Sequence, residues 1–233
     1  MSKDLVFDFD GVIFDTAFEA FRIACASTKL IDDPFSLDLD NLYPEFMLFR
    51  PYVGPAWNYY YVLENIIKNK NISHLDWNYS SSCNSFEKEF FLTRKHWSVK
   101  EREKWLNLQK PYTEVINILQ RQNIKPIILT NKNKESVVEL LENENIAFEK
   151  VISMTQFPQE KTKGDVLNEE LSDSLFFIDD HYPTIADAVI KNKNPKRVIK
   201  YANWGYGSSD CCRHNISLTE LEKCIEGLIL SIK

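Results

Sequence analysis

Leu5-Val6-Phe7-Asp8-Phe9-Asp10-Gly11-Val12-Ile13-Phe14-Asp15-Thr16 is the stretch from which the fold and the chemistry of this chain are predicted. It opens with an unbroken apolar run, which is typical of a strand buried on both faces of a parallel sheet. Asp8 and Asp10 follow this run, and Gly11 allows the backbone to turn. Open α/β sheets keep their ligand sites at the carboxyl ends of parallel strands. The pattern therefore predicts an active site here, with Asp8 as nucleophile and Asp10 as its acid/base partner.

Composition narrows the class of protein. The 233 residues are 44% hydrophobic and 27% charged, enough for one large domain or a core with a smaller module. The formal net charge is -6 and there is no basic stripe, so we expect no nucleic-acid partner. No apolar run approaches the ~20 residues of a membrane span. The five cysteines are irregularly spaced, so we expect a cytoplasmic protein with reduced thiols and no membrane partner.

Hydrophobic periodicity predicts the architecture. Apolar runs at 125–131, 148–153, 175–180 and 197–201 are typical of buried strands, and amphipathic helical patterns lie between them. The pattern over 111–119 predicts a helix with Pro111 in its first turn. Strands alternating with helices indicate an α/β fold, with a mostly parallel sheet and helices on both faces.

The segment 17–109 differs from the rest of the chain. It contains four of the five tryptophans and has no long β-branched strand. Its periodicity favours helices, among them 55–70, 85–97 and 98–108. We therefore expect an α-helical insert over 17–109, in a core formed by residues 1–16 and 110–233.

Three predicted strands end in polar residues, which are Asp8 with Asp10, Thr130 with Asn131, and Asp179 with Asp180. In a parallel sheet these ends meet at one edge, and four carboxylates placed there repel one another unless a cation lies among them. Oxygen ligands without histidine or thiolate favour Mg²⁺. Either Lys161 or Lys163, just before the last of these strands, could balance the remaining charge and hold an anion.

This set of groups suits phosphoryl transfer. The reaction needs an in-line nucleophile, neutralisation of the phosphoryl oxygens and a proton donor for the leaving group. A carboxylate can attack phosphorus and form an aspartyl-phosphate. A second carboxylate can protonate the leaving group and later activate water. The hydroxyl of Thr130 can donate to a phosphate oxygen.

The sequence resembles the haloacid dehalogenase superfamily, of the phosphatase type. The resemblance is carried by four segments in the family's order, which are Asp8-Phe9-Asp10-Gly11-Val12-Ile13-Phe14-Asp15-Thr16, Ile128-Leu129-Thr130-Asn131, Lys163-Gly164-Asp165-Val166-Leu167 and Phe177-Ile178-Asp179-Asp180. It covers about 1–16 and 110–210. The later stretch Asn203-Trp204-Gly205-Tyr206-Gly207 resembles a glycine-containing loop of many relatives, and we expect it to border the site.

The resemblance implies a Rossmann-like core with a helical cap inserted after the first motif. It implies that Asp8 is the nucleophile, that Asp10 is the general acid/base, and that Lys163 is the lysine that holds the phosphate. Thr130 and Asn131 are then expected to contact the substrate. Mg²⁺ is expected at the ligand set formed by Asp8, Asp10 through its backbone carbonyl, Asp179 and Asp180. The second aspartate of the first motif argues against dehalogenation.

These observations predict a Mg²⁺-dependent phosphatase that acts on a small phosphorylated metabolite. The alternatives are a phosphomutase that uses the same aspartyl-phosphate, and a phosphate-binding protein without turnover. The sequence does not name the substrate. It leaves the oligomeric state open, with a homodimer as one option.

Overall fold

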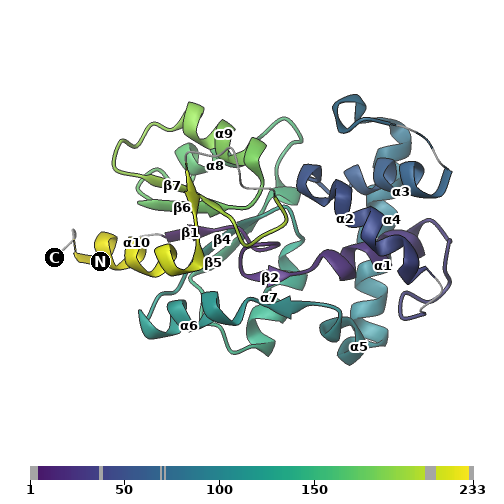
Figure 1. Cartoon of the computed structure of the whole chain (residues 1–233), viewed down its shortest axis with the longest axis horizontal. Helices are drawn as coiled ribbons and strands as arrows, with labels where there is room; N and C mark the ends of the chain where they lie inside the picture. The colour runs from purple at the N-terminus through teal and green to yellow at the C-terminus, as the bar shows by residue number, and fades with distance from the viewer. Residues whose placement is uncertain (1–4, 37–38, 69, 71, 208–213, 231–233) are drawn as a thin grey trace. The chain divides into compact units, whose positions relative to one another are not determined.

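The computed structural model describes residues 5–36, 39–68, 70, 72–207 and 214–230. The chain divides into two compact units. One unit is Met1–Asp15 together with Pro111–Lys233, and the other is Thr16–Lys110 (Figure 1). The first contains the large β-sheet, and the second is helical.

The large sheet has six parallel strands in the order β5-β4-β1-β6-β7-β8. The strands are β1 (Leu5–Phe7), β4 (Ile127–Thr130), β5 (Lys150–Ser153), β6 (Phe176–Asp179), β7 (Val198–Ala202) and β8 (Asn215–Ile216). β1 lies between β4 and β6, and all three of its residues are buried. The α/β, Rossmann-like architecture predicted from the sequence is confirmed. The edge strand β8 was not predicted, because two residues are too few to show a period.

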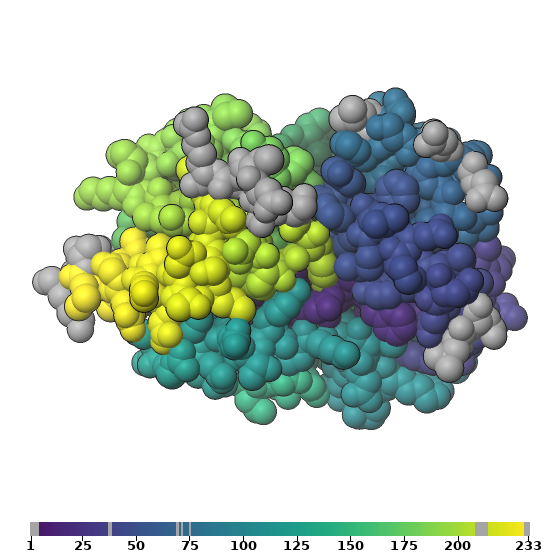
Figure 2. All heavy atoms as spheres, viewed as in Figure 1, coloured from purple at the N-terminus to yellow at the C-terminus, as the bar shows by residue number. Residues whose placement is uncertain are grey.

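Helices cover both faces of this sheet. They are α6 (Thr113–Arg121), α7 (Lys134–Asn143), α8 (Lys163–Glu169), α9 (Tyr182–Lys191) and α10 (Leu218–Leu230), with the short 3₁₀ helix η4 (Met154–Gln156). In the strand order given above, the connection through α7 leads from β4 to β5, toward one edge of the sheet. The connections through α8 (β5 to β6) and α9 (β6 to β7) lead toward the other edge. Right-handed crossovers therefore place the two groups on opposite faces, as Figure 1 shows. The last helix, α10, lies beside α6 (Figure 2). Arg121 of α6 pairs with Glu222 of α10 at 2.8 Å.

The start of α6 differs from the prediction. Pro111 belongs to a strand, β3 (Lys110–Pro111), which pairs with β2 (Phe14–Asp15), and α6 begins at Thr113. The amide of Tyr112 donates to the carbonyl of Ile13 at 2.8 Å and keeps the chain extended at this point. A tertiary hydrogen bond thus overrides the preference of proline for a first helical turn.

The helical unit contains no strand longer than two residues in its described part. Its helices are α1 (Ala17–Ser27), α2 (Tyr43–Phe49), α3 (Asn58–Lys68), α4 (Ser81–Lys100) and α5 (Arg102–Asn107), with the 3₁₀ helices η1 (Asp40–Leu42), η2 (Arg50–Tyr52) and η3 (His74–Asp76). The predicted break near 97–98 was wrong, since α4 continues to Lys100 and the chain leaves helical geometry at Glu101. No described helix is both long and apolar enough to cross a membrane.

Aromatic rings and one buried ion pair hold this helical unit together. Tyr59 stacks between Phe46 and Phe90, with centroid distances of 5.4 and 5.5 Å. Arg94 of α4 donates two hydrogen bonds of 2.8 Å to Glu19 of α1. The indole of Trp105 donates a third at 3.0 Å. Glu19 is fully buried, so these three donors replace the water it lost on folding.

The buried ion pair allows a first prediction. Arg94→Met should lower the free energy of unfolding by about 3–5 kcal/mol, because it leaves the carboxylate of Glu19 buried without its cation. The measurement is urea unfolding followed by circular dichroism. Arg121→Met is the matched control, since Arg121 is 58% exposed in its pair with Glu222 and such pairs contribute at most about 1 kcal/mol. Equal losses in the two variants would contradict the prediction.

Candidate active site

Lys163 lies between two carboxylates at the carboxyl edge of the sheet. Its Nζ is 2.9 Å from Oδ1 of Asp8 and 2.7 Å from Oδ2 of Asp179, and its side chain is 4% exposed. Lys161, the alternative that the sequence left open, instead pairs with Glu169 at 2.9 Å. The structure therefore places Lys163, and not Lys161, among the carboxylates.

The start of α8 positions Lys163. Thr162 and Asp165 form a capping box, in which the Thr162 hydroxyl accepts from the Asp165 amide while the Asp165 carboxylate accepts from the Thr162 amide. Such reciprocal bonds satisfy two amides that a helix start leaves unpaired. Lys163 is the first residue of the helix. The cap thus fixes the point from which the lysine reaches the two aspartates.

Three carboxylates form a cluster at this edge. Oxygens of Asp8, Asp179 and Asp180 lie within 4.8 Å of one another, and all three residues are buried. Burial is the main reason that the pKa of Asp8 lies well above its usual range. Repulsion from Asp179 raises this pKa further, and the positive charge of Lys163 lowers it. Burial alone would lower the pKa of Lys163, but Asp179 and Asp8 raise it. The cluster therefore has more negative charge than one lysine offsets.

The donor set of this cluster fits a hard divalent cation. All three side chains offer carboxylate oxygens, close enough together to bind one ion. Oxygen ligands of this kind suit Mg²⁺. The side chain of Asp10 lies outside this group of three, so its predicted part in metal binding depends on its backbone carbonyl and stays a prediction.

Asp10 has a partner that we did not predict. Nζ of Lys132 lies 3.3 Å from Oδ1 of Asp10, and the lysine side chain is 1% exposed. Two hydrogen bonds hold the backbone of Lys132. Its amide donates to the Thr130 hydroxyl at 3.1 Å, and its carbonyl accepts from the Ser153 hydroxyl at 2.8 Å. Lys132 comes two residues after Thr130, and this position just beyond a strand end was the signal available in the sequence.

Thr130 and Asn131 lie at the end of β4, as predicted. Thr130 is fully buried, and its oxygen accepts from the Lys132 amide. Its hydroxyl hydrogen can therefore be donated to a bound anion. Asn131 is half-buried. Within the described part of the chain it makes no hydrogen bond to the aspartates, so the structure adds nothing to its predicted role.

Each clustered carboxylate also accepts a backbone amide. Phe9 donates to Asp8 at 2.7 Å. His181 donates to Asp179 at 2.8 Å. Tyr206 donates to Asp180 at 2.7 Å. Hydrogen bonds from amides to ionised carboxylates are among the stronger ones in proteins, and here they orient all three side chains.

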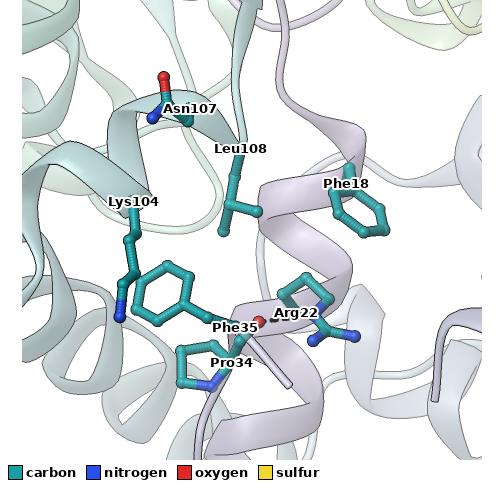
Figure 3. Close-up of a pocket in the computed structure, with 7 residues that line it drawn as sticks. All are labelled: Phe18, Arg22, Pro34, Phe35, Lys104, Asn107 and Leu108. Carbon is teal, nitrogen blue, oxygen red and sulfur yellow. Dashed lines mark hydrogen bonds between the residues drawn. The ribbon is translucent and has the colours of Figure 1, made fainter. Parts of the chain in front are cut away.

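The helical unit has a pocket of its own, of about 240 Å³ (Figure 3). It is lined by Phe18, Arg22, Pro34, Phe35, Lys104, Asn107 and Leu108. Arg22 already donates to the carbonyl of Pro34 and pairs with Asp40. The lining is mostly apolar and includes none of the aspartates described above. We therefore assign the chemistry to the sheet edge and not to this pocket.

Solved structures share this fold at low sequence identity. A protein of Clostridium acetobutylicum provisionally named a phosphatase has a TM-score of 0.61 at 18% identity, over 97% of this chain and 100% of its own. A Haemophilus somnus protein provisionally named a phosphoglycolate phosphatase has a TM-score of 0.62 at 15% identity, over 96% of this chain and 98% of its own. A Thermotoga maritima protein provisionally named a β-phosphoglucomutase has a TM-score of 0.54 at 15% identity, over 97% of this chain and 99% of its own.

The sequence itself identifies the family. No curated protein matches the chain significantly. The family model described as haloacid dehalogenase-like hydrolase, however, matches residues 4–192. This range includes the first motif, Thr130, Lys163, and both Asp179 and Asp180. The chain therefore belongs to the haloacid dehalogenase-like hydrolases.

Proposed function

We propose that this protein is a Mg²⁺-dependent phosphatase that hydrolyses a small phosphorylated metabolite through an aspartyl-phosphate at Asp8. The contact of Lys163 with both Asp8 and Asp179, at 2.9 and 2.7 Å, carries the proposal. The ammonium group of Lys163 would then lie beside the proposed nucleophile, where the negative charge of a transferring phosphoryl group needs neutralisation. Membership of the hydrolase family supports the reaction class.

The proposed reaction has two steps. A carboxylate oxygen of Asp8 attacks phosphorus while the bond to the leaving oxygen breaks, and Asp10 gives that oxygen its proton. Asp10, now a carboxylate, then takes a proton from water. The water oxygen attacks phosphorus, the bond to Asp8 breaks, and inorganic phosphate leaves. Thr130 and Lys163 hold the phosphoryl oxygens in both steps.

The carboxylates of Asp8, Asp179 and Asp180 are the side chains that would hold Mg²⁺. When bound, the ion would supply positive charge that neutralises the phosphoryl oxygens. The chain's own lysines have separate tasks in this scheme. Lys163 contacts Asp8 and Asp179, whereas Lys132 contacts Asp10 and keeps the acid/base group in place.

We also propose that the helical unit acts as a cap that selects the substrate. It is a compact body of its own with an aromatic core, inserted directly after the first motif. A cap that closes over a site excludes water and large ligands. This favours a small phosphorylated metabolite over a phosphorylated macromolecule.

The nucleophile provides the main test of this proposal. Wild type should release phosphate from at least one member of a panel of phosphate monoesters in the presence of Mg²⁺, and Asp8→Asn should abolish the release because an amide cannot form the acyl-phosphate. Chelation should abolish it as well. Acid quenching of wild type with ³²P-labelled substrate should leave label on Asp8. Asp173→Asn, at an exposed aspartate outside the site, is the control and should keep full activity.

Other outcomes would contradict the proposal. Phosphate release that persists in Asp8→Asn or after chelation would rule out this mechanism. Conversion of one phosphate isomer to another, without net release, would indicate a phosphomutase. Mg²⁺ binding without turnover of any monoester would indicate a phosphate-binding protein.

Lys132 provides a separate prediction. Lys132→Met keeps most of the length of the side chain but removes the cation that contacts Asp10, so protonation of the leaving group should become less efficient. We expect kcat/KM for an alkyl phosphate to fall about 10²-fold, the lower end of what general acid catalysis contributes. For p-nitrophenyl phosphate kcat/KM should change little, because p-nitrophenolate leaves without a proton.

The control for this prediction is Lys134→Met. Lys134 is exposed at the start of α7, two residues away. It should behave as wild type with both substrates. An equal loss of kcat/KM for alkyl and aryl phosphates in Lys132→Met would show that Lys132 does not act through Asp10.

A further inference from the structure

The loop 203–207 leaves the sheet beside the proposed metal ligands. It follows β7, which pairs with β6 so that Tyr201 is aligned with Asp179. Because the two strands are parallel and neighbouring, the loop begins at the edge where Asp179 ends β6 and Asp180 follows it. The mechanism proposed above gives this loop no role.

The loop encloses the side chain of Asp180. The amide of Tyr206 donates to Oδ2 of Asp180 at 2.7 Å. A Cβ atom added at Gly205 would lie 2.4 Å from that same oxygen and 2.6 Å from the carbonyl oxygen of Gly11. Real Cβ atoms do not approach other atoms so closely. Only glycine at position 205 therefore lets the loop reach Asp180.

Gly11 forms the other wall around Asp180. Its φ is +80°, and a Cβ there would lie 2.0 Å from Oδ2 of Asp180. The Asp180 carboxylate thus fits between two glycines, one from the first motif and one from the loop. Such close backbone approach is a common reason for glycine at a site.

Two side-chain hydrogen bonds anchor the loop to the first motif. The indole of Trp204 donates to the carbonyl of Val12 at 3.1 Å. The hydroxyl of Tyr206 lies 3.0 Å from Oδ1 of Asp15, to which it donates. The loop therefore contacts Asp180 and, at two further points, the turn that follows Asp8 and Asp10.

We propose that Trp204–Gly207 is a positioning element for the metal site. The Tyr206 amide holds Oδ2 of Asp180 and so orients the carboxylate that would bind the cation together with those of Asp8 and Asp179. Trp204 and the Tyr206 hydroxyl fix the loop against Val12 and Asp15, in the segment that follows the proposed nucleophile. This inference rests on the proposed Mg²⁺-dependent function and assigns residues that act on the metal through Asp180.

The test compares two glycine variants by calorimetric titration with Mg²⁺ alone, without substrate. Gly205→Ala should weaken Mg²⁺ binding about 10- to 100-fold, the usual effect of changing groups that orient a metal ligand. Gly227→Ala is the matched control, because a Cβ at this position in α10 meets no atom within 4 Å. It should bind Mg²⁺ as wild type does. Asp180→Asn marks the loss expected when the ligand itself is changed.

A second variant removes the anchors without adding volume. Trp204→Phe/Tyr206→Phe loses both side-chain hydrogen bonds and keeps the Tyr206 amide. We expect weaker Mg²⁺ binding with little change in the urea midpoint, and recovery of kcat at saturating Mg²⁺. A loop with a purely structural role would lower the urea midpoint and leave the affinity of the folded protein for Mg²⁺ unchanged.

The outcomes separate this inference from the proposed function. If wild type binds Mg²⁺, and both Gly205→Ala and the double variant bind it equally well, the role of the loop is overturned and the phosphatase proposal stands. If wild type binds no Mg²⁺, both are overturned. A selective loss of affinity in these two variants supports the loop as the element that positions Asp180.

Discussion

The repulsion among carboxylates gathered at one sheet edge is the constraint on which the rest of the structure depends. Asp8, Asp179 and Asp180 have oxygens within 4.8 Å of one another in a buried site. Lys163, at 2.9 and 2.7 Å from two of them, offsets part of this charge. The capping box at Thr162, the backbone amides that each carboxylate accepts, and the close fit of Asp180 beside Gly11 all serve to keep these groups together.

The same constraint explains why the site is assembled from distant segments. Charges of one sign are costly to place near one another along a flexible loop, but parallel strands fix them rigidly. β4, β1 and β6 are adjacent in the sheet although they begin at residues 127, 5 and 176. The stability of the buried strands thus supports an arrangement that is electrostatically unfavourable by itself.

The sequence allowed the strand ends to be predicted because apolar runs followed by acids have a clear physical meaning. Lys163 could be preferred over Lys161 only by the resemblance to the family. The Thr162–Asp165 capping box, which makes Lys163 the first residue of α8, was a further signal available in the sequence. Lys132 was missed because nothing in a local pattern tells a buried lysine from an exposed one. Its burial depends on Asp10, 122 residues earlier in the chain. The short strand β3 was missed for a similar reason, since a hydrogen bond to Ile13 holds it.

The two units balance their buried charges differently, and this difference favours the sheet edge as the place of the active site. In the helical unit, Glu19 is matched by Arg94, so the pair needs no further ion. At the sheet edge, Lys132 contacts Asp10, and Lys163 contacts Asp8 and Asp179, two of the three clustered carboxylates. When ionised, the three clustered carboxylates of Asp8, Asp179 and Asp180 carry two more negative charges than Lys163 offsets, and one divalent cation would match them. The excess of carboxylates in this buried cluster therefore favours a bound cation at the sheet edge, whereas the Glu19–Arg94 pair contributes to the stability of the helical unit.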